Sequence, residues 1–198
     1  MTRQRSRSIN EVSPVPIVLN RVLGSLALPD KRDWLVAAVT LVIYGTIALP
    51  LGFGLGFLQL RVWSANWKDH LLLAFRALIT PALTEELVFR VLLLPNPIEV
   101  VNLGKWTLWA VLSLLLFIVY HPLNAKTSFR AGFPTFFDPV FLTLAGLLGL
   151  ACTVAYALTG SLLVIAFIHW IVVVVWLLLF GGMQQLHIHQ SHKPDSST

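Results

Sequence analysis

The chain has 198 residues, of which 57% are hydrophobic and 12% are charged, and its mean hydropathy is +0.79. Soluble domains carry about 25% charged residues, so this composition excludes an ordinary soluble domain and predicts an all-α, multi-pass transmembrane helical bundle. The net charge of +5 lacks the aromatic–basic pattern of a nucleic-acid surface. We therefore expect membrane lipids, and no nucleic acid, as partners. The single Cys152 excludes an internal disulfide.

Residues 1–33 form a basic N-terminal arm. Residues 1–13 are polar and expected to be disordered, whereas residues 14–29 are apolar, interrupted by proline, and compatible with a short interfacial helix. Basic residues before a first span favour the cytoplasmic side, so we expect a cytoplasmic N-terminus. The arm does not resemble a cleavable signal peptide, because the apolar stretch after it is too long. The basic residues of the arm are Arg3, Arg5, Arg7, Arg21, Lys31 and Arg32.

Five hydrophobic segments follow within residues 34–180, which we expect to form one transmembrane domain. The first, 34–58, has no charge and exceeds the roughly 20 residues that span a bilayer core; Pro50 should kink its far end. The others cover residues 71–94, broken at Pro81, and 106–120, 140–158 and 161–180. The last two should form a tight antiparallel hairpin. If the broken segment only dips into the membrane, the orientation of everything after it inverts.

The polar tail, residues 181–198, contains His187, His189 and His192. Loose metal binding by these histidines is one interpretation. A solvated tail is the preferred one, because nothing rigid holds the ligands.

The second segment contains the sequence PALTEELVFRVLLLP, residues 81–95, with Glu85, Glu86 and Arg90. A charge at the centre of a membrane costs on the order of 2.5–3.5 kcal/mol, so such groups face partners or a cavity. Glu86 and Arg90 are four residues apart and can pair on one helix face, while Glu85 points about 100° away and stays free to act. Alternatively, both glutamates only complement the dipole of a helix that begins at Pro81.

Two histidines also lie in apolar segments. His169 is close to mid-membrane, and His121 precedes Pro122, where we expect the helix to end. Each has a structural alternative: an interhelical hydrogen bond for His169, and a cap that faces the headgroups for His121. Together with two glutamates they can support water activation by a carboxylate, with oxyanion stabilisation by histidine. Glu85, His121 and His169 can alternatively hold zinc, although an H-E-x-x-H sequence is absent.

Three short motifs in order resemble the CPBP family, also called the Abi family, of CAAX proteases and bacteriocin-processing enzymes. EELVFR (85–90) fits E-E-x-x-x-R, FIVYH (117–121) fits F-x-x-x-H, and His169 stands in GSLLVIAFIHW. The resemblance covers a motif core of residues 70–176 and implies an intramembrane endopeptidase of the glutamic type that requires no cofactor. It implies that Glu85 activates water with help from His121, and that His169 stabilises the oxyanion. Glu86 and Arg90 would hold the site in shape, with Phe117 packing beside His121.

One residue departs from the family pattern. Many members have Asn or Asp four residues after the last histidine, where this chain has Val173. The departure favours a second hypothesis, a catalytically silent membrane scaffold or partner-binding protein, and Asn124 is a candidate substitute donor. A small transporter or proton relay is a third hypothesis. If the chain is a protease, its substrate is a peptide or a membrane protein. The loop of residues 126–139, rich in phenylalanine, is a candidate entrance to the site.

Overall fold

The structure is a computed structural model that describes residues 14–187 of the chain. The expectations for residues 1–13, and for His189 and His192 in the tail, lie outside the described residues. Helices dominate the described part, which contains no strand, and an isolated bridge joins Arg61 to Phe180. The all-α prediction is confirmed.

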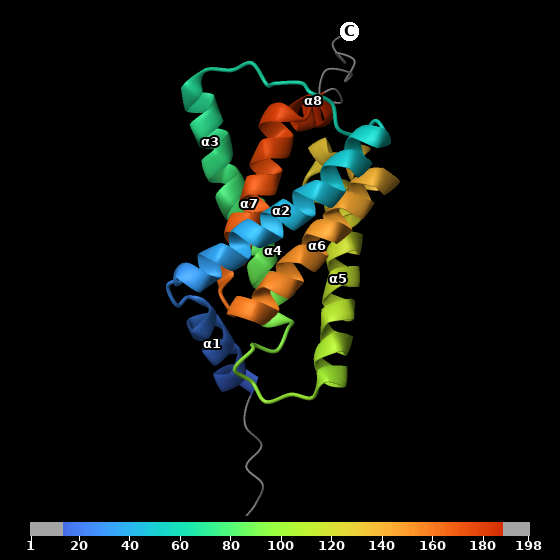
Figure 1. Cartoon of the computed structure of the whole chain (residues 1–198). Coiled ribbons are helices and arrows are strands. Elements are labelled where there is room, and N and C mark those ends of the chain that lie inside the picture. The colour runs from blue at the N-terminus through green and yellow to red at the C-terminus, as the bar shows by residue number, and fades with distance from the viewer. Residues whose placement is uncertain (1–13, 188–198) are drawn as a thin grey trace, which may run out of the picture.

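Long apolar helices form the body of the bundle (Figure 1). Four helices among the described residues are long and apolar enough to cross a membrane: α2 (Lys31–Gly54), α5 (Leu103–Lys126), α6 (Pro139–Thr159) and α7 (Leu162–Leu179). The broken second segment comprises α3 (Trp67–Ala77), the π-helical η1 (Leu78–Leu83), α4 (Thr84–Glu86) and the π-helical η2 (Leu87–Leu92). Short elements complete the chain: α1 (Pro14–Ser25), η3 (Arg130–Gly132), η4 (Thr135–Phe137) and α8 (Gly182–His187).

The broken segment runs along the bundle, from the end that holds α8 to the end that holds α1 (Figure 1). It therefore does not dip and return within the bundle, and the orientation of the chain after it stays a prediction. Between α6 and α7 the chain turns within two residues, and Gly160 adopts a left-handed conformation with φ of +64°. This turn forms the helical hairpin expected from the sequence.

Two helix boundaries differ from those expected. The first long helix begins at Lys31 rather than Trp34, because Asp30 and Asp33 form a reciprocal cap at its start. Helix α5 passes through Pro122 and ends at Lys126, so the expectation that a helix stops at His121 is wrong. Proline inside membrane helices is tolerated because neighbouring helices and local adjustments satisfy the freed backbone groups.

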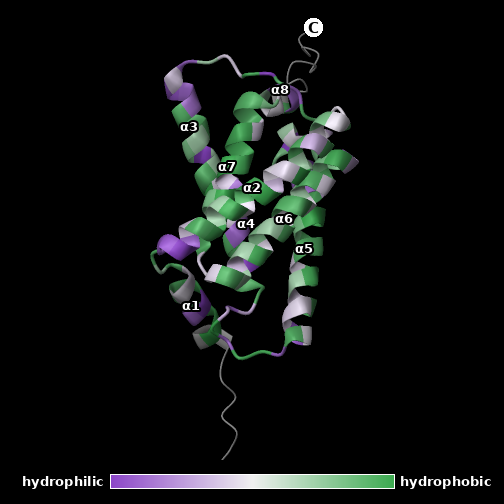
Figure 2. Ribbon diagram, in the orientation of Figure 1, coloured by the Kyte–Doolittle hydropathy of each residue, from purple (hydrophilic) through white to green (hydrophobic). Residues whose placement is uncertain are grey.

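Hydrophobic residues cover most of α6 and α7, while polar residues gather at the ends of the bundle and at α4 inside it (Figure 2). Side chains of α6 and α7 form the main core cluster, which also receives Val91 and Leu94 from just after the glutamates. A second cluster collects Phe89, Phe117 and Phe141. The charged segment of the sequence is thus enclosed between two apolar clusters.

Candidate active site

The glutamates lie just after a break in the second membrane segment. Thr80 leaves the helical conformation, with φ of −136° and ψ of 113°, and Pro81 follows it. We call residues 81–92, which resume the helix after this break, the motif helix. Its exposed fractions are 7% at Glu85 and 0% at Glu86, so both carboxylates are withdrawn from the lipid-facing surface.

The expected ion pair of Glu86 with Arg90 is present, and it is fully buried. Arg90 Nη1 lies 3.3 Å from Glu86 Oε1, and Arg90 Nη2 donates to the carbonyl of Gly149 on α6 at 2.9 Å. The guanidinium carbon lies 4.3 Å from the centroid of the Phe117 ring. A buried charge pair is stable only with good geometry and further hydrogen bonds, and here helix α6 supplies one of them.

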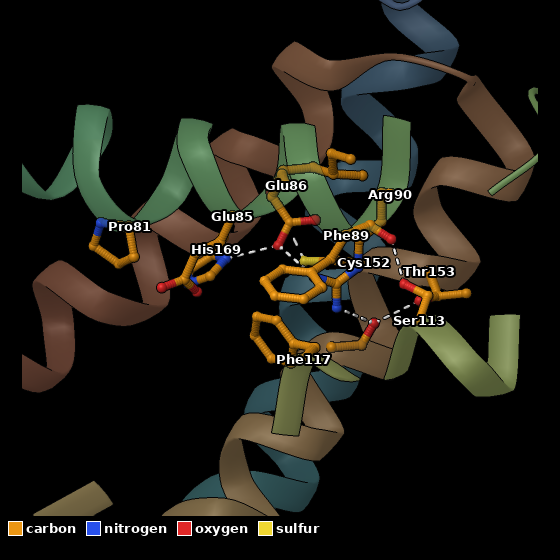
Figure 3. Close-up of polar contacts among 12 residues, drawn as sticks. Pro81, Glu85, Glu86, Phe89, Arg90, Ser113, Phe117, Cys152, Thr153 and His169 are labelled. Carbon is orange, nitrogen blue, oxygen red and sulfur yellow. Dashed lines mark hydrogen bonds and ion pairs between the residues drawn. The ribbon is translucent and has the colours of Figure 1, made fainter. Parts of the chain in front are cut away.

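Glu86 also contacts His169 (Figure 3). The spacing of the motifs does not reveal this contact. Nδ1 of His169 lies 2.7 Å from Glu86 Oε1, the same oxygen that Arg90 contacts. Because a carboxylate can only accept, we assign a proton to Nδ1. The other ring nitrogen, Nε2, then faces Glu85 at 3.8 Å from Oε2. Glu86 therefore orients His169 toward Glu85.

Among the described residues, Glu85 makes no side-chain hydrogen bond, whereas Glu86 is held through Oε1 and leaves its Oε2 without a partner. Oε2 of Glu85 is also buried and has no hydrogen-bond partner within residues 14–187. A buried polar atom without a partner is costly, and such atoms in a cavity wall commonly mark a position for water or a ligand. Arg90 and His169 hold Glu86 as expected, and the catalytic role of Glu85 stays a prediction.

His121 lies inside α5 and is buried, so its alternative role as an exposed helix cap is wrong. Nδ1 lies 2.9 Å from the Phe117 carbonyl one turn earlier and donates to it, which leaves Nε2 as an acceptor. The Phe117 ring contacts both histidines, with its centroid 4.9 Å from that of His121 and 6.0 Å from that of His169. The structure thus joins Glu85, Glu86, Arg90 and His169 directly and brings His121 beside them through Phe117.

A cavity of about 650 Å³ extends from Glu85 between α2, α5, α6 and α7. Glu85, His121 and His169 share its wall, and most of the remaining lining residues are apolar. Phe129 and Phe136 bring the loop expected at the entrance into the same wall. The cavity therefore connects the ionisable cluster with an apolar volume.

Val173 and Asn124 both line this cavity. Valine offers no hydrogen-bond donor at position 173, whereas Asn124 follows His121 by one turn of α5. In the described part of the chain, no hydrogen bond engages the amide of Asn124. Asn124 therefore faces the cavity with a donor available, which the sequence alone does not reveal.

Helix α6 contributes a residue that the sequence analysis missed. A side chain at Gly149 would collide with Arg90, because an added Cβ would lie 2.8 Å from Nη2. A glycine inside an otherwise strongly apolar helix signals a close approach, and that signal is present in the sequence. On α5, Ser113 donates a hydrogen bond to the Phe89 carbonyl and ties the motif helix to α5.

The zinc alternative finds no support in the donor geometry. Within residues 14–187, no three His, Cys, Asp or Glu side chains are arranged to hold a metal ion.

No curated protein and no solved structure matches the chain. The model of one family, described as type II CAAX prenyl endopeptidase Rce1-like, matches residues 65–175, more than half of the chain. The match includes all three motifs and agrees with the resemblance seen in the sequence. Together with the apolar helices, it identifies an integral membrane protein. The chain belongs to the Rce1-like family of type II CAAX prenyl endopeptidases.

Proposed function

We propose that the chain is an intramembrane endopeptidase that hydrolyses a peptide bond near the membrane with water activated by Glu85. The observation that carries the proposal is the Glu85 carboxylate, which is buried in the cavity wall, has an oxygen without a partner, and faces Nε2 of His169 at 3.8 Å. Membership in a family of endopeptidases supports the reaction class. A cavity that excludes bulk water strengthens every electrostatic interaction within it.

In the proposed reaction a water molecule occupies the cavity beside Glu85. Glu85 takes a proton from the water as its oxygen attacks the peptide carbonyl carbon. His121 assists through Nε2, the nitrogen left as an acceptor by the bond to the Phe117 carbonyl. His169, protonated at both ring nitrogens, stabilises the oxyanion by donating from Nε2 while Nδ1 donates to Glu86. When the tetrahedral intermediate collapses, the leaving amine receives the proton from Glu85.

The supporting residues keep this arrangement in place. Arg90 holds Glu86, which in turn orients His169, and Phe117 packs against both histidines. Every step uses side chains of this chain, so the proposed mechanism requires no cofactor.

The apolar cavity supports a substrate with a lipid-like or strongly apolar part. The family description makes a prenylated CAAX tail the first substrate to test, and an unmodified apolar peptide or a membrane-protein segment the second. We also propose a cytoplasmic N-terminus, on the basis of Arg3, Arg5 and Arg7.

The test is cleavage of prenylated and plain peptide libraries by the purified protein in lipid nanodiscs. Glu85→Gln should abolish cleavage, whereas Asp33→Asn, an equally conservative change at an exposed helix cap, should not. A chelator should have no effect; inhibition by it would favour the zinc alternative. Cleavage that persists in Glu85→Gln would refute the proposed role of Glu85.

A silent scaffold is the second candidate function, and Val173 in the cavity wall is the observation that favours it. Loss of one oxyanion donor can lower kcat by about 10²–10³. Absence of cleavage by the wild type across both libraries would favour the scaffold.

A further inference from the structure

The N-terminal helix α1 is attached to the end of the motif helix. Arg21 of α1 donates from Nε and Nη2 to the two carboxylate oxygens of Glu99, at 2.6 and 2.8 Å. Nη1 of Arg21 donates to the carbonyl of Leu92 at 3.1 Å. Leu92 is the last residue of η2, two positions after Arg90. We call these three hydrogen bonds the Arg21 clasp.

The break at Thr80 separates the motif helix from α3, so contacts at its ends add to the hydrogen bonds that it makes with Ser113 and Gly149 along its length. Helix α3 has its own attachment, through Trp170 Nε1, which donates to the carbonyl of Ala74 at 2.7 Å. At the other end, Leu92 carries a carbonyl of the last helical turn, which has no partner within the helix. Arg21 supplies that partner from outside the segment.

The clasp also reaches the α6–α7 hairpin. Glu99 accepts the backbone N–H of Asn96 at 2.9 Å, and Asn96 Nδ2 donates to the hydroxyl of Tyr156 on α6 at 3.2 Å. Asn96 is 4% exposed, and its side chain lies close to Gly160 in the turn between α6 and α7. One charged pair thus connects α1 to the two elements that carry Arg90 and its acceptor Gly149.

We propose that Arg21 is a positioning residue, which fixes the C-terminal end of the motif helix and thereby the placement of Glu85 and Glu86. The N-terminal arm, which lies outside residues 65–175, then helps to position the site. The catalytic meaning of this placement rests on the proposed function, whereas the placement itself can be measured without it. A planar guanidinium suits the task, because it binds a carboxylate through two parallel bonds and still has a donor for Leu92.

The test is hydrogen exchange, read by mass spectrometry, of the protein in lipid nanodiscs. Arg21→Ala should accelerate exchange of residues 84–94 by about tenfold or more, because charge-assisted hydrogen bonds are lost there. Exchange within α7 and in α6 before Tyr156 should stay unchanged. Arg21→Lys keeps the positive charge but lacks the parallel donors of the guanidinium, and it should give an intermediate exchange rate at residues 84–94. Arg32→Ala removes an exposed arginine with no contact to the motif helix, and should match the wild type.

Unchanged exchange at residues 84–94 in Arg21→Ala would overturn the proposal. A uniform acceleration through α6 and α7 would also overturn it, because it would mean that Arg21 stabilises the whole bundle rather than one helix.

Kinetics provide a second readout if the wild type cleaves a peptide. A displaced catalytic group can cost about 10²-fold in rate, so Arg21→Ala should lower kcat by about 10- to 100-fold and change KM by less than about twofold. A rise in KM alone would contradict the proposal. If no peptide is cleaved, the proposed function fails. Hydrogen exchange still tests whether Arg21 fixes the end of the motif helix.

Discussion

Gly149→Ala tests whether the packing of Arg90 is as tight as the structure requires. A Cβ at position 149 would lie 2.8 Å from Arg90 Nη2, 2.8 Å from Leu114 Cδ1 and 2.9 Å from Phe117 Cδ1. Favourable carbon contacts begin at about 3.5 Å, so all three neighbours would have to move. Arg90 cannot swing away, because it is fully buried and bonded to Glu86 and to the Gly149 carbonyl itself.

Overpacking of a fixed core costs about 1–3 kcal/mol. The substitution should therefore lower the free energy of unfolding by that amount, measured by denaturant titration in micelles. It should also reduce any proteolytic activity, because Arg90 holds Glu86. Gly146→Ala is the matched control on the same helix: its Cβ would lie 3.2 Å from Cδ1 of Ile118, the end of a flexible side chain. Equal stability of the two variants would refute the reasoning.

The remaining predictions concern Arg90, Glu99 and the cavity wall. Arg90→Met should lower the free energy of unfolding by about 3–5 kcal/mol, because it leaves a buried carboxylate without its partner; adding Glu86→Gln should recover part of the loss in the same titration. The hydrogen bond from Arg21 lowers the pKa of Glu99 below 4.5, so the clasp should be intact above that pH and be lost as the pH falls through the lowered pKa. Spin labels on Val18→Cys and Val100→Cys in a Cys152→Ala background should report an increased distance upon acidification, and an unchanged distance would contradict the assignment. Val173→Asn should raise kcat by up to about 10²-fold by adding an oxyanion donor. If Asn124 already supplies such a donor, Asn124→Leu should lower kcat. Cleavage kinetics of both variants measure these effects.

Several features of the fold and the site follow from local sequence pattern. Uncharged stretches long enough to span a bilayer predict the membrane helices, and the spacing of four between Glu86 and Arg90 predicts their pair. The break near Pro81 is likewise a local property of the chain. Such features depend on residues within one or two helical turns, which a sequence displays directly.

Other features require the packed bundle. His169 contacts Glu86 across 83 positions, and Arg21 contacts Glu99 across 78, and no local pattern connects such distant residues. Helix α5 continues through Pro122, as membrane helices often do, and propensity alone does not predict this continuation.

The most direct test of the central claim, that Glu85 activates water, is a single turnover in H₂¹⁸O with a peptide that the wild type cleaves. If water attacks the peptide bond, the new carboxyl group of the product carries one ¹⁸O and the side chain of Glu85 carries none. If Glu85 instead attacks the carbonyl and forms an anhydride, hydrolysis can leave ¹⁸O in Glu85 and unlabelled oxygen in the product. Mass spectrometry of both the product and the peptide that contains Glu85 distinguishes these outcomes. Label in the product alone is the predicted result, and label in Glu85 would contradict the proposed mechanism.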